Sequence, residues 1–181
     1  MSGLVPGSRR LSQRISEGDG IAIIARVGDV ESARAAEAGG AKALAIDRAV
    51  AGIREATSLP VLWLGDGSPV DADAVATRPG RDIATALEAV LDVRDEDELE
   101  EALERHDPQI FLLSPREGYD DEDPLVLVLE LLPDVPAGKL AIADVDVATR
   151  DEVVALERAG FDAVLAVGAV GDLVGAAPPD V

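Results

Sequence analysis

Residues 139–167, KLAIADVDVATRDEVVALERAGFDAVLAV, contain one complete strand–helix–strand unit. The stretch opens on the apolar run KLAIAD and closes on DAVLAV, and both runs have the length of a buried strand. Between the two runs, Thr149 and Glu152 have the spacing of a capping box that begins a helix, and Gly160 follows the last apolar turn. A strand, a helix and a second strand in this order predict a right-handed βαβ unit in a parallel sheet.

The same pattern recurs along the chain. Further apolar runs of strand length lie at 21–27, 42–47, 60–65, 88–93 and 109–114, with a weaker one at 73–77. Helical patterns lie between them at 30–38, 48–57, 99–105 and 123–132. We therefore predict an α/β fold, a minimal (β/α)8 TIM-type barrel of parallel strands.

One part of this barrel departs from the repeat. The stretch 66–81 is rich in Gly, Pro and Asp and leaves no room for a full helix after the third strand. We expect the fourth βα unit to be eroded there, which can leave the barrel incompletely closed. A doubly wound open sheet is the alternative, but it usually carries a Gly-rich phosphate turn after its first strand, and residues 26–30 contain none.

Length and charge limit the classes of function. A chain of 181 residues fits one domain, which we place at 1–181 with an N-terminal segment at 1–18 and a short tail at 171–181. The net charge is −20, from 36 acidic and 16 basic residues, so nucleic acid and anionic membranes are not expected as partners. Many acids, few lysines and almost no aromatic residues are also typical of salt-adapted proteins.

Residue usage excludes further chemistry. The chain has no cysteine, which excludes disulfides and zinc–thiolate sites, and the single histidine, His106, cannot build a multi-histidine metal site. No apolar run reaches the length of about 18 residues that a membrane span needs, and no signal segment opens the chain, so we expect a cytoplasmic protein. No cofactor is expected.

Three phrases resemble the indole-3-glycerol phosphate synthase family, within the ribulose-phosphate-binding barrels. Residues 58–62 (SLPVL) are similar to its third strand, 91–99 (LDVRDEDEL) to its fifth strand, and 148–165 to its seventh helix and eighth strand. The resemblance runs in order over residues 12–175, although sugar-phosphate epimerases and small aldolases share phrases such as AGFDAVL. It implies a barrel that closes an indole ring, by decarboxylation and dehydration of a phosphorylated anthranilate derivative, in tryptophan synthesis.

The residues that carry the family's chemistry are replaced. Its general-acid lysine at the end of strand three falls on Leu64, and a second lysine on strand one falls on Gly28. The only lysines, Lys42 and Lys139, begin their strands and so belong to the opposite face. A glycine near the family's substrate phosphate falls on Asp146, whose carboxylate would repel a dianion.

These replacements predict a catalytically degenerate barrel that acts as a binding or non-catalytic protein. The alternative is a lyase or isomerase that acts on a small phosphorylated substrate, including the parent synthase by an altered route. We expect a small anionic ligand or a partner protein.

Polar residues remain at the predicted carboxyl ends of the strands. Asp92 and Asp144 match family carboxylates and could form an acid/base pair, with Arg116 as an anion clamp, and these three are the candidate catalytic residues. The candidate ligand-binding residues are Arg26, Asp47, Asp66, Ser114 and Gly168. Two alternatives stay open: the charges could pair with one another inside the barrel mouth, or the carboxylates could bind a divalent ion.

Overall fold

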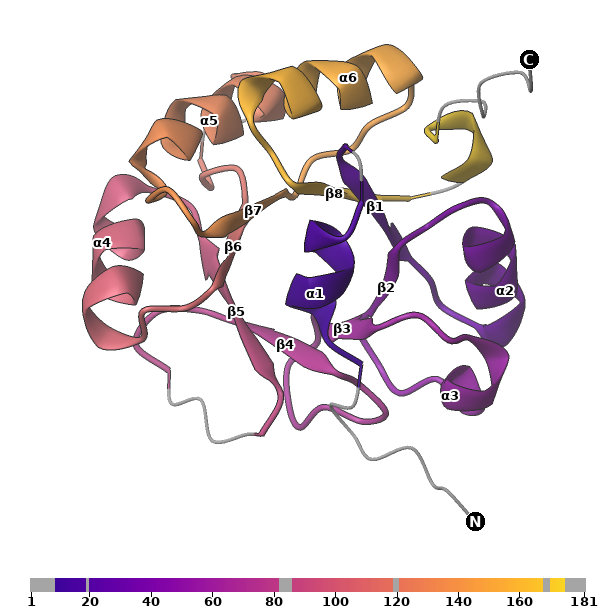
Figure 1. Ribbon diagram of the computed structural model, residues 1–181. Helices are drawn as coiled ribbons and strands as arrows, with labels where there is room; N and C mark the ends of the chain where they lie inside the picture. Colours follow the sequence, from indigo (N-terminus) through magenta and orange to yellow (C-terminus); the bar gives the residue numbers. More distant parts are fainter. Residues whose placement is uncertain (1–8, 19, 82–85, 119–120, 168–169, 175–181) are drawn as a thin grey trace.

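Eight parallel strands form a closed barrel in the order β1 to β8, and helices surround it (Figure 1). The computed structural model describes residues 9–18, 20–81, 86–118, 121–167 and 170–174. The first and last strands pair from Ala22 opposite Ala163 to Ala25 opposite Ala166, which closes the ring. The predicted (β/α)8 barrel is therefore confirmed, and the open sheet is not.

All the apolar runs that we predicted to be strands are strands. Their bounds are β1 (Ala22–Arg26), β2 (Ala43–Ile46), β3 (Val61–Trp63), β4 (Ala74–Thr77), β5 (Glu88–Val93), β6 (Ile110–Leu113), β7 (Leu140–Ala143) and β8 (Ala163–Ala166). The helices are α1 (Leu11–Ser16), α2 (Val30–Ala38), α3 (Ile53–Ala56), α4 (Glu96–Arg105), α5 (Pro124–Leu131) and α6 (Arg150–Ala159), with short 3₁₀ turns η1 (Leu132–Asp134) and η2 (Val170–Asp172). None of these helices is long and apolar enough to cross a membrane.

The eroded unit closes the barrel. Strand β4 lies inside the stretch 66–81 and pairs with β3 at two positions and with β5 at four. What this unit has lost is helix: residues 64–73 turn back toward β4 without one, and the described residues between β4 and β5 contain none. Closure therefore needs the strand at this point and not the helix.

Two helical segments differ from the prediction. The helix expected at 48–57 is reduced to α3, because Gly52 adopts a left-handed conformation (φ 80°) directly before it and Thr57 is extended directly after it. The segment 1–18 was expected to be an N-terminal extension only, yet it contains α1. That helix lies over the centre of the strand ring in Figure 1.

Helix α1 plugs the amino-terminal end of the barrel. Leu11 is fully buried and Ile15 nearly so, and both belong to the cluster of side chains that fills the barrel interior. The carboxylate of Glu88, at the start of β5, accepts hydrogen bonds from the backbone N–H groups of Leu11 and Ser12. This carboxylate satisfies N–H groups that the first turn of a helix leaves unpaired.

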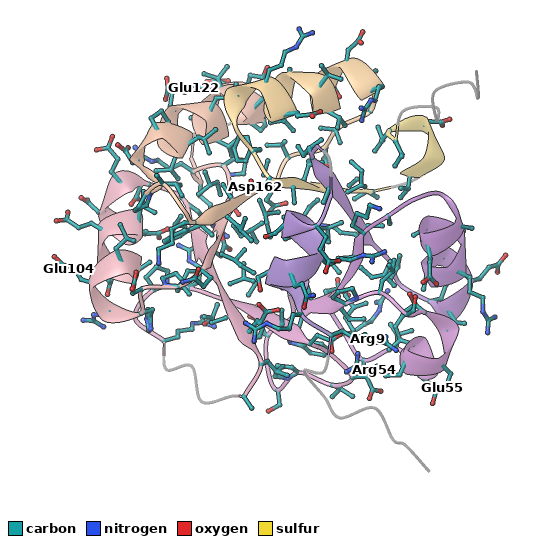
Figure 2. All side chains as sticks on the ribbon, viewed as in Figure 1. Arg9, Arg54, Glu55, Glu104, Glu122 and Asp162 are labelled. Atoms are coloured by element: carbon teal, nitrogen blue, oxygen red, sulfur yellow. The ribbon has the colours of Figure 1, made fainter. Side chains whose placement is uncertain are left out.

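A buried ion pair secures this end of the barrel. Asp73 has no exposed surface, and its carboxylate accepts hydrogen bonds from both terminal nitrogens of Arg54, at 2.7 and 2.9 Å. The same carboxylate accepts from the backbone N–H of Val61 at 2.9 Å. Arg9 lies beside Arg54 (Figure 2), and its guanidinium donates to the backbone carbonyls of Arg54 and Leu59. The ion pair thus connects α3, β3 and the segment before α1.

Loss of this carboxylate should strongly destabilise the fold. In Asp73→Ala the guanidinium of Arg54 stays buried without its partner, which costs about 3–5 kcal/mol of unfolding free energy. Glu101→Ala is the matched control, because Glu101 forms an exposed i,i+4 pair with Arg105 whose loss costs under about 1 kcal/mol. Urea unfolding of both variants measures the difference, and equal losses would contradict this role for Asp73.

Candidate functional site

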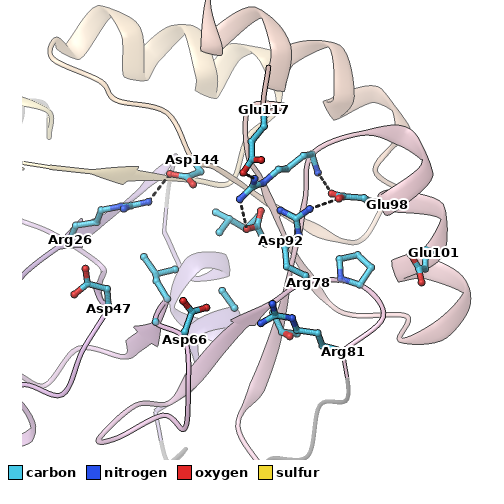
Figure 3. A pocket seen from close by; sticks show the side chains of 17 residues that line it. Arg26, Asp47, Asp66, Arg78, Arg81, Asp92, Glu98, Glu101, Glu117 and Asp144 are labelled. Atoms are coloured by element: carbon cyan, nitrogen blue, oxygen red, sulfur yellow. Dashed lines mark hydrogen bonds and ion pairs between the residues drawn. The ribbon is translucent and has the colours of Figure 1, made fainter. Parts of the chain in front are cut away.

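A cavity of about 700 Å³ opens at the carboxyl ends of the strands. Figure 3 shows its charged side chains converging from several strands and the loops that follow them. The arginines in its lining are Arg26, Arg78, Arg81 and Arg94, and the acidic residues are Asp47, Asp66, Asp92, Glu98, Glu101, Glu117 and Asp144. Carboxylates outnumber guanidinium groups, so the mouth as a whole is acidic.

Strand alternation explains which residues face the mouth. Side chains two positions apart point to the same side of a strand. On β1 the interior residue Ile24 is therefore followed by Arg26, and on β7 Ile142 is followed by Asp144. The same step leads from the interior residue Ala76 to Arg78.

The sequence prediction missed Arg78, Arg81 and Arg94. Arg94 lies two residues beyond Asp92, so counting by two along β5 would have found it, and the same count from β4 would have found Arg78. The residues that the family resemblance indicated lie at other positions. Arg81 lies farther from its strand, and no periodic signal marks it.

Asp144 and Arg26 form an ion pair across the mouth. The Nη2 of Arg26 lies 2.9 Å from Oδ1 of Asp144, and both side chains are partly exposed. The other oxygen of Asp144 lies 3.1 Å from the hydroxyl of Ser114, which is buried. Two of the predicted ligand-binding residues, Arg26 and Ser114, thus contact the predicted catalytic residue Asp144.

Asp92 is the acidic residue whose ionisation the site disfavours. Burial raises the pKa of the Asp92 carboxyl, and the nearby charge of Asp144 acts in the same direction. The hydroxyl of Ser114, at 2.7 Å, and the charges of Arg94 and Arg78 only partly oppose that rise. The nearest nitrogen of Arg94 is 3.8 Å from Asp92, which is longer than a hydrogen bond.

On the β4–β5 side of the mouth, arginines form ion pairs with carboxylates. Glu98, on α4, accepts from the guanidinium of Arg78 and, with its other oxygen, from the backbone N–H of Arg94 at 2.7 Å. The guanidinium of Arg94 also donates to Glu117, in the loop after β6. Among the described residues, no carboxylate forms a salt bridge with Arg81, which is exposed.

The remaining predicted residues lie at different places. Asp47 and Asp66 line the same cavity, at the ends of β2 and β3, and both are exposed. Between them the chain approaches closely, because a Cβ on Gly65 would lie 2.2 Å from the carbonyl oxygen of Asp47. Arg116 lines a separate, smaller pocket over α4 and α5, and Gly168 is outside the described residues.

Leu64 occupies the place where the resemblance puts a catalytic lysine. It lines the mouth and packs against the interior cluster of the barrel. Lys42 and Lys139 directly precede β2 and β7, and Lys139 pairs with Asp107 at 2.7 Å on the opposite face. Since the chain has no other lysine, none can face the mouth.

Comparison with known proteins gives one partial match in sequence. Over 111 residues, which are 61% of this chain, it is 32% identical to indole-3-glycerol phosphate synthase from Variovorax paradoxus (strain S110). The match covers 39% of that protein, so the chain spans well under half the length of this relative. No protein-family model matches the chain.

Solved structures share the fold over nearly the whole chain. The N-acetylmannosamine-6-phosphate 2-epimerase from Clostridium perfringens has a TM-score of 0.67 at 15% identity, covering 94% of this chain and 95% of its own. Thiamine phosphate pyrophosphorylase from Pyrococcus furiosus has a TM-score of 0.63 at 18% identity, covering 91% and 92%. At these identities the likeness establishes the TIM-type barrel.

The mouth combines two chemical capacities. Its arginines can bind an anionic group, and the carboxyl of Asp92, with its raised pKa, holds a proton to higher pH than an ordinary aspartate. Among the described residues, no three His, Asp or Glu side chains gather closely enough to hold a metal ion. The arginines and the carboxyl of Asp92 favour chemistry based on charge pairing and proton transfer.

The raised pKa of Asp92 should appear in the pH dependence of stability. An ordinary aspartate has a pKa of about 3.9 in the unfolded chain, so the folded protein binds more protons between that pH and the raised pKa. The contribution of Asp92 to stability therefore falls as the pH rises from about 4 to the raised pKa, by about 1.4 kcal/mol for each pH unit in that interval.

Asp92→Asn removes this penalty. Measured by urea unfolding, its stability relative to the native protein should increase as the pH rises through that interval. Asp66→Asn is the control for the loss of one carboxylate at the mouth. A stability difference for Asp92→Asn that stays constant with pH, or that Asp66→Asn reproduces, would contradict the raised pKa.

Proposed function

We propose that this chain binds a small anionic ligand at the barrel mouth and does not catalyse the indole-3-glycerol phosphate synthase reaction. The observation that carries the proposal is Leu64, an apolar side chain at the position where the resemblance requires a lysine. A leucine cannot protonate a carbonyl oxygen or hold a departing carboxylate. The partial match to the synthase and the phosphorylated compounds in the names of the three similar proteins described above support a phosphate ligand.

The charge pairing within the mouth supports binding without that reaction. Arg26 pairs with Asp144, Arg78 with Glu98, and Arg94 with Glu117. A cation that already has a carboxylate partner contributes less to a new anion, because the first pair must separate. Arg81 lines the same cavity and has no such partner among the described residues, so we assign it the first contact with the anionic group.

Ligand binding can be tested with simple anions. Thermal shift and calorimetric titration with inorganic phosphate, sulfate and indole-3-glycerol phosphate should show binding of at least one of them. Arg81→Gln should weaken that binding about tenfold or more, as expected for the loss of a charge-assisted hydrogen bond. Arg34→Gln, an exposed arginine on α2, is the control and should leave binding unchanged. No binding of any anion, or equal effects of the two substitutions, would overturn the ligand proposal.

Synthase activity is a separate test. The native protein should not convert the phosphorylated anthranilate substrate or support growth of a tryptophan auxotroph. The double variant Gly28→Lys/Leu64→Lys should remain inactive, because a side chain at position 28 enters beside the guanidinium of Arg48 and Asp146 remains in place. Turnover by the native protein would refute the proposal. Turnover by the double variant would show that Arg48 and Asp146 do not prevent the reaction.

A second candidate function is isomerase or lyase activity on a small phosphorylated substrate. The contact of Ser114 with both Asp92 and Asp144 favours this function, because it brings two carboxyl groups together at the mouth. Such groups can give a proton to a substrate or take one from it. Incubation with small sugar phosphates in deuterated water would discriminate between the two functions. Exchange of a carbon-bound hydrogen, seen by NMR and lost in Asp92→Asn, would favour an enzyme over a binding protein.

A further inference from the structure

The hydroxyl of Ser114 lies between two carboxyl groups. Its Oγ is 2.7 Å from Oδ1 of Asp92 and 3.1 Å from Oδ2 of Asp144, both within hydrogen-bond range. A serine hydroxyl carries one hydrogen, so it can donate to only one of the two oxygens at a time. If both carboxyls were ionised, the other contact would bring two lone pairs together. A second hydrogen, carried by one of the carboxyls, makes both contacts favourable.

The surroundings identify the carboxyl that carries this hydrogen. Asp144 makes a direct ion pair with Arg26 at 2.9 Å, which favours its ionised form. Within the described part of the chain, no guanidinium lies within hydrogen-bond distance of Asp92, and only 18% of its side chain is exposed. Burial without a directly bonded cation favours the neutral form of a carboxyl.

We propose that Asp92, Ser114 and Asp144 form one proton-holding unit, in which protonated Asp92 donates to Ser114 and Ser114 donates to ionised Asp144. The other charged groups that face this unit are Arg26 on β1, Arg78 after β4, Arg94 after β5, Glu98 on α4 and Glu117 after β6. Arg78 and Arg94 favour ionisation of Asp92, but Glu98 and Glu117 hold their guanidinium groups.

The held proton defines what the mouth can recognise. In the free protein the one hydrogen of a neutral Asp92 is held by Ser114, so a ligand oxygen beside the anionic group, such as that of a carbonyl or a carboxylate, takes this hydrogen bond over from Ser114. If the proton passes to that oxygen, Asp92 becomes ionised and Ser114 can donate its hydrogen to Asp92 in place of Asp144. This consequence rests on the proposed ligand site, whereas the shared proton is a property of the free protein.

Infrared spectroscopy of the ligand-free protein tests the shared proton directly. As the pH is raised above about 4, the ordinary pKa of an aspartate, the native protein should keep the carbonyl stretch of a protonated carboxyl group to higher pH than ordinary aspartates do. Asp92→Asn should abolish this band, and Asp66→Asn, a matched loss at the same mouth, should retain it. Ser114→Ala should shift its frequency, because the neutral carboxyl loses its hydrogen-bond partner.

Each outcome decides the proposal. Absence of the band from the native protein, its survival in Asp92→Asn, or an unchanged frequency in Ser114→Ala would overturn it. Should a variant fail to fold, the carboxyl carbon shifts of ¹³C-aspartate-labelled native protein give the answer without substitution. One aspartate should then keep its proton to higher pH than the others, and uniform titration of all aspartates would also overturn the proposal. Failure of anion binding alone would leave this result intact.

Discussion

The buried carboxylate of Asp73 is the contact on which closure of the barrel depends. Its backbone N–H donates to the carbonyl of Val61 at 2.8 Å, its carbonyl accepts from Glu88 at 3.2 Å, and its side chain accepts from Arg54 and Val61. One residue therefore connects β3, the start of β4 and β5. This is the part of the ring where no helix follows β3, so a polar junction takes the place of helix packing. Arg9 and α1 add to the same junction from the amino terminus.

Helix α1 closes one end of the barrel, and the cavity opens at the other end. Interior positions near α1 are apolar, whereas the same inward positions become charged or polar at the carboxyl ends of the strands. Charge pairs neutralise much of that polarity locally, as in Arg26 with Asp144. The vestigial interpretation, in which charges pair inside the mouth, accounts for those pairs. It does not account for Ser114, which faces two carboxyls with one hydrogen.

Much of the fold could be predicted because its signals are local. Nearly continuous apolar runs mark strands that are buried on both sides, and Thr149 with Glu152 marks the start of α6 through a capping box that the structure contains. The helix expected at 48–57 was mostly wrong because Gly52, in a left-handed conformation, limits it to a single turn. The sequence did not predict helix α1, because so short a helix is stabilised only when its apolar face packs against the barrel interior.

The candidate site was predictable only in part. The resemblance and the predicted strand ends identified residues that the structure brings to one mouth. The alternation of side chains along β4 and β5 also indicates two further arginines there, which the sequence prediction did not include.

The sequence by itself determined the succession of strands and helices, the excess of acidic residues and the absence of lysine from the mouth, since these depend on residue type and short-range spacing. Tertiary structure alone decided that β4 completes the ring, that α1 fills its base, that Arg116 lines another pocket and that Ser114 bridges Asp92 and Asp144. Such contacts join residues far apart in the chain. Their distances, and the burial that raises the pKa of Asp92, exist only once the barrel has closed.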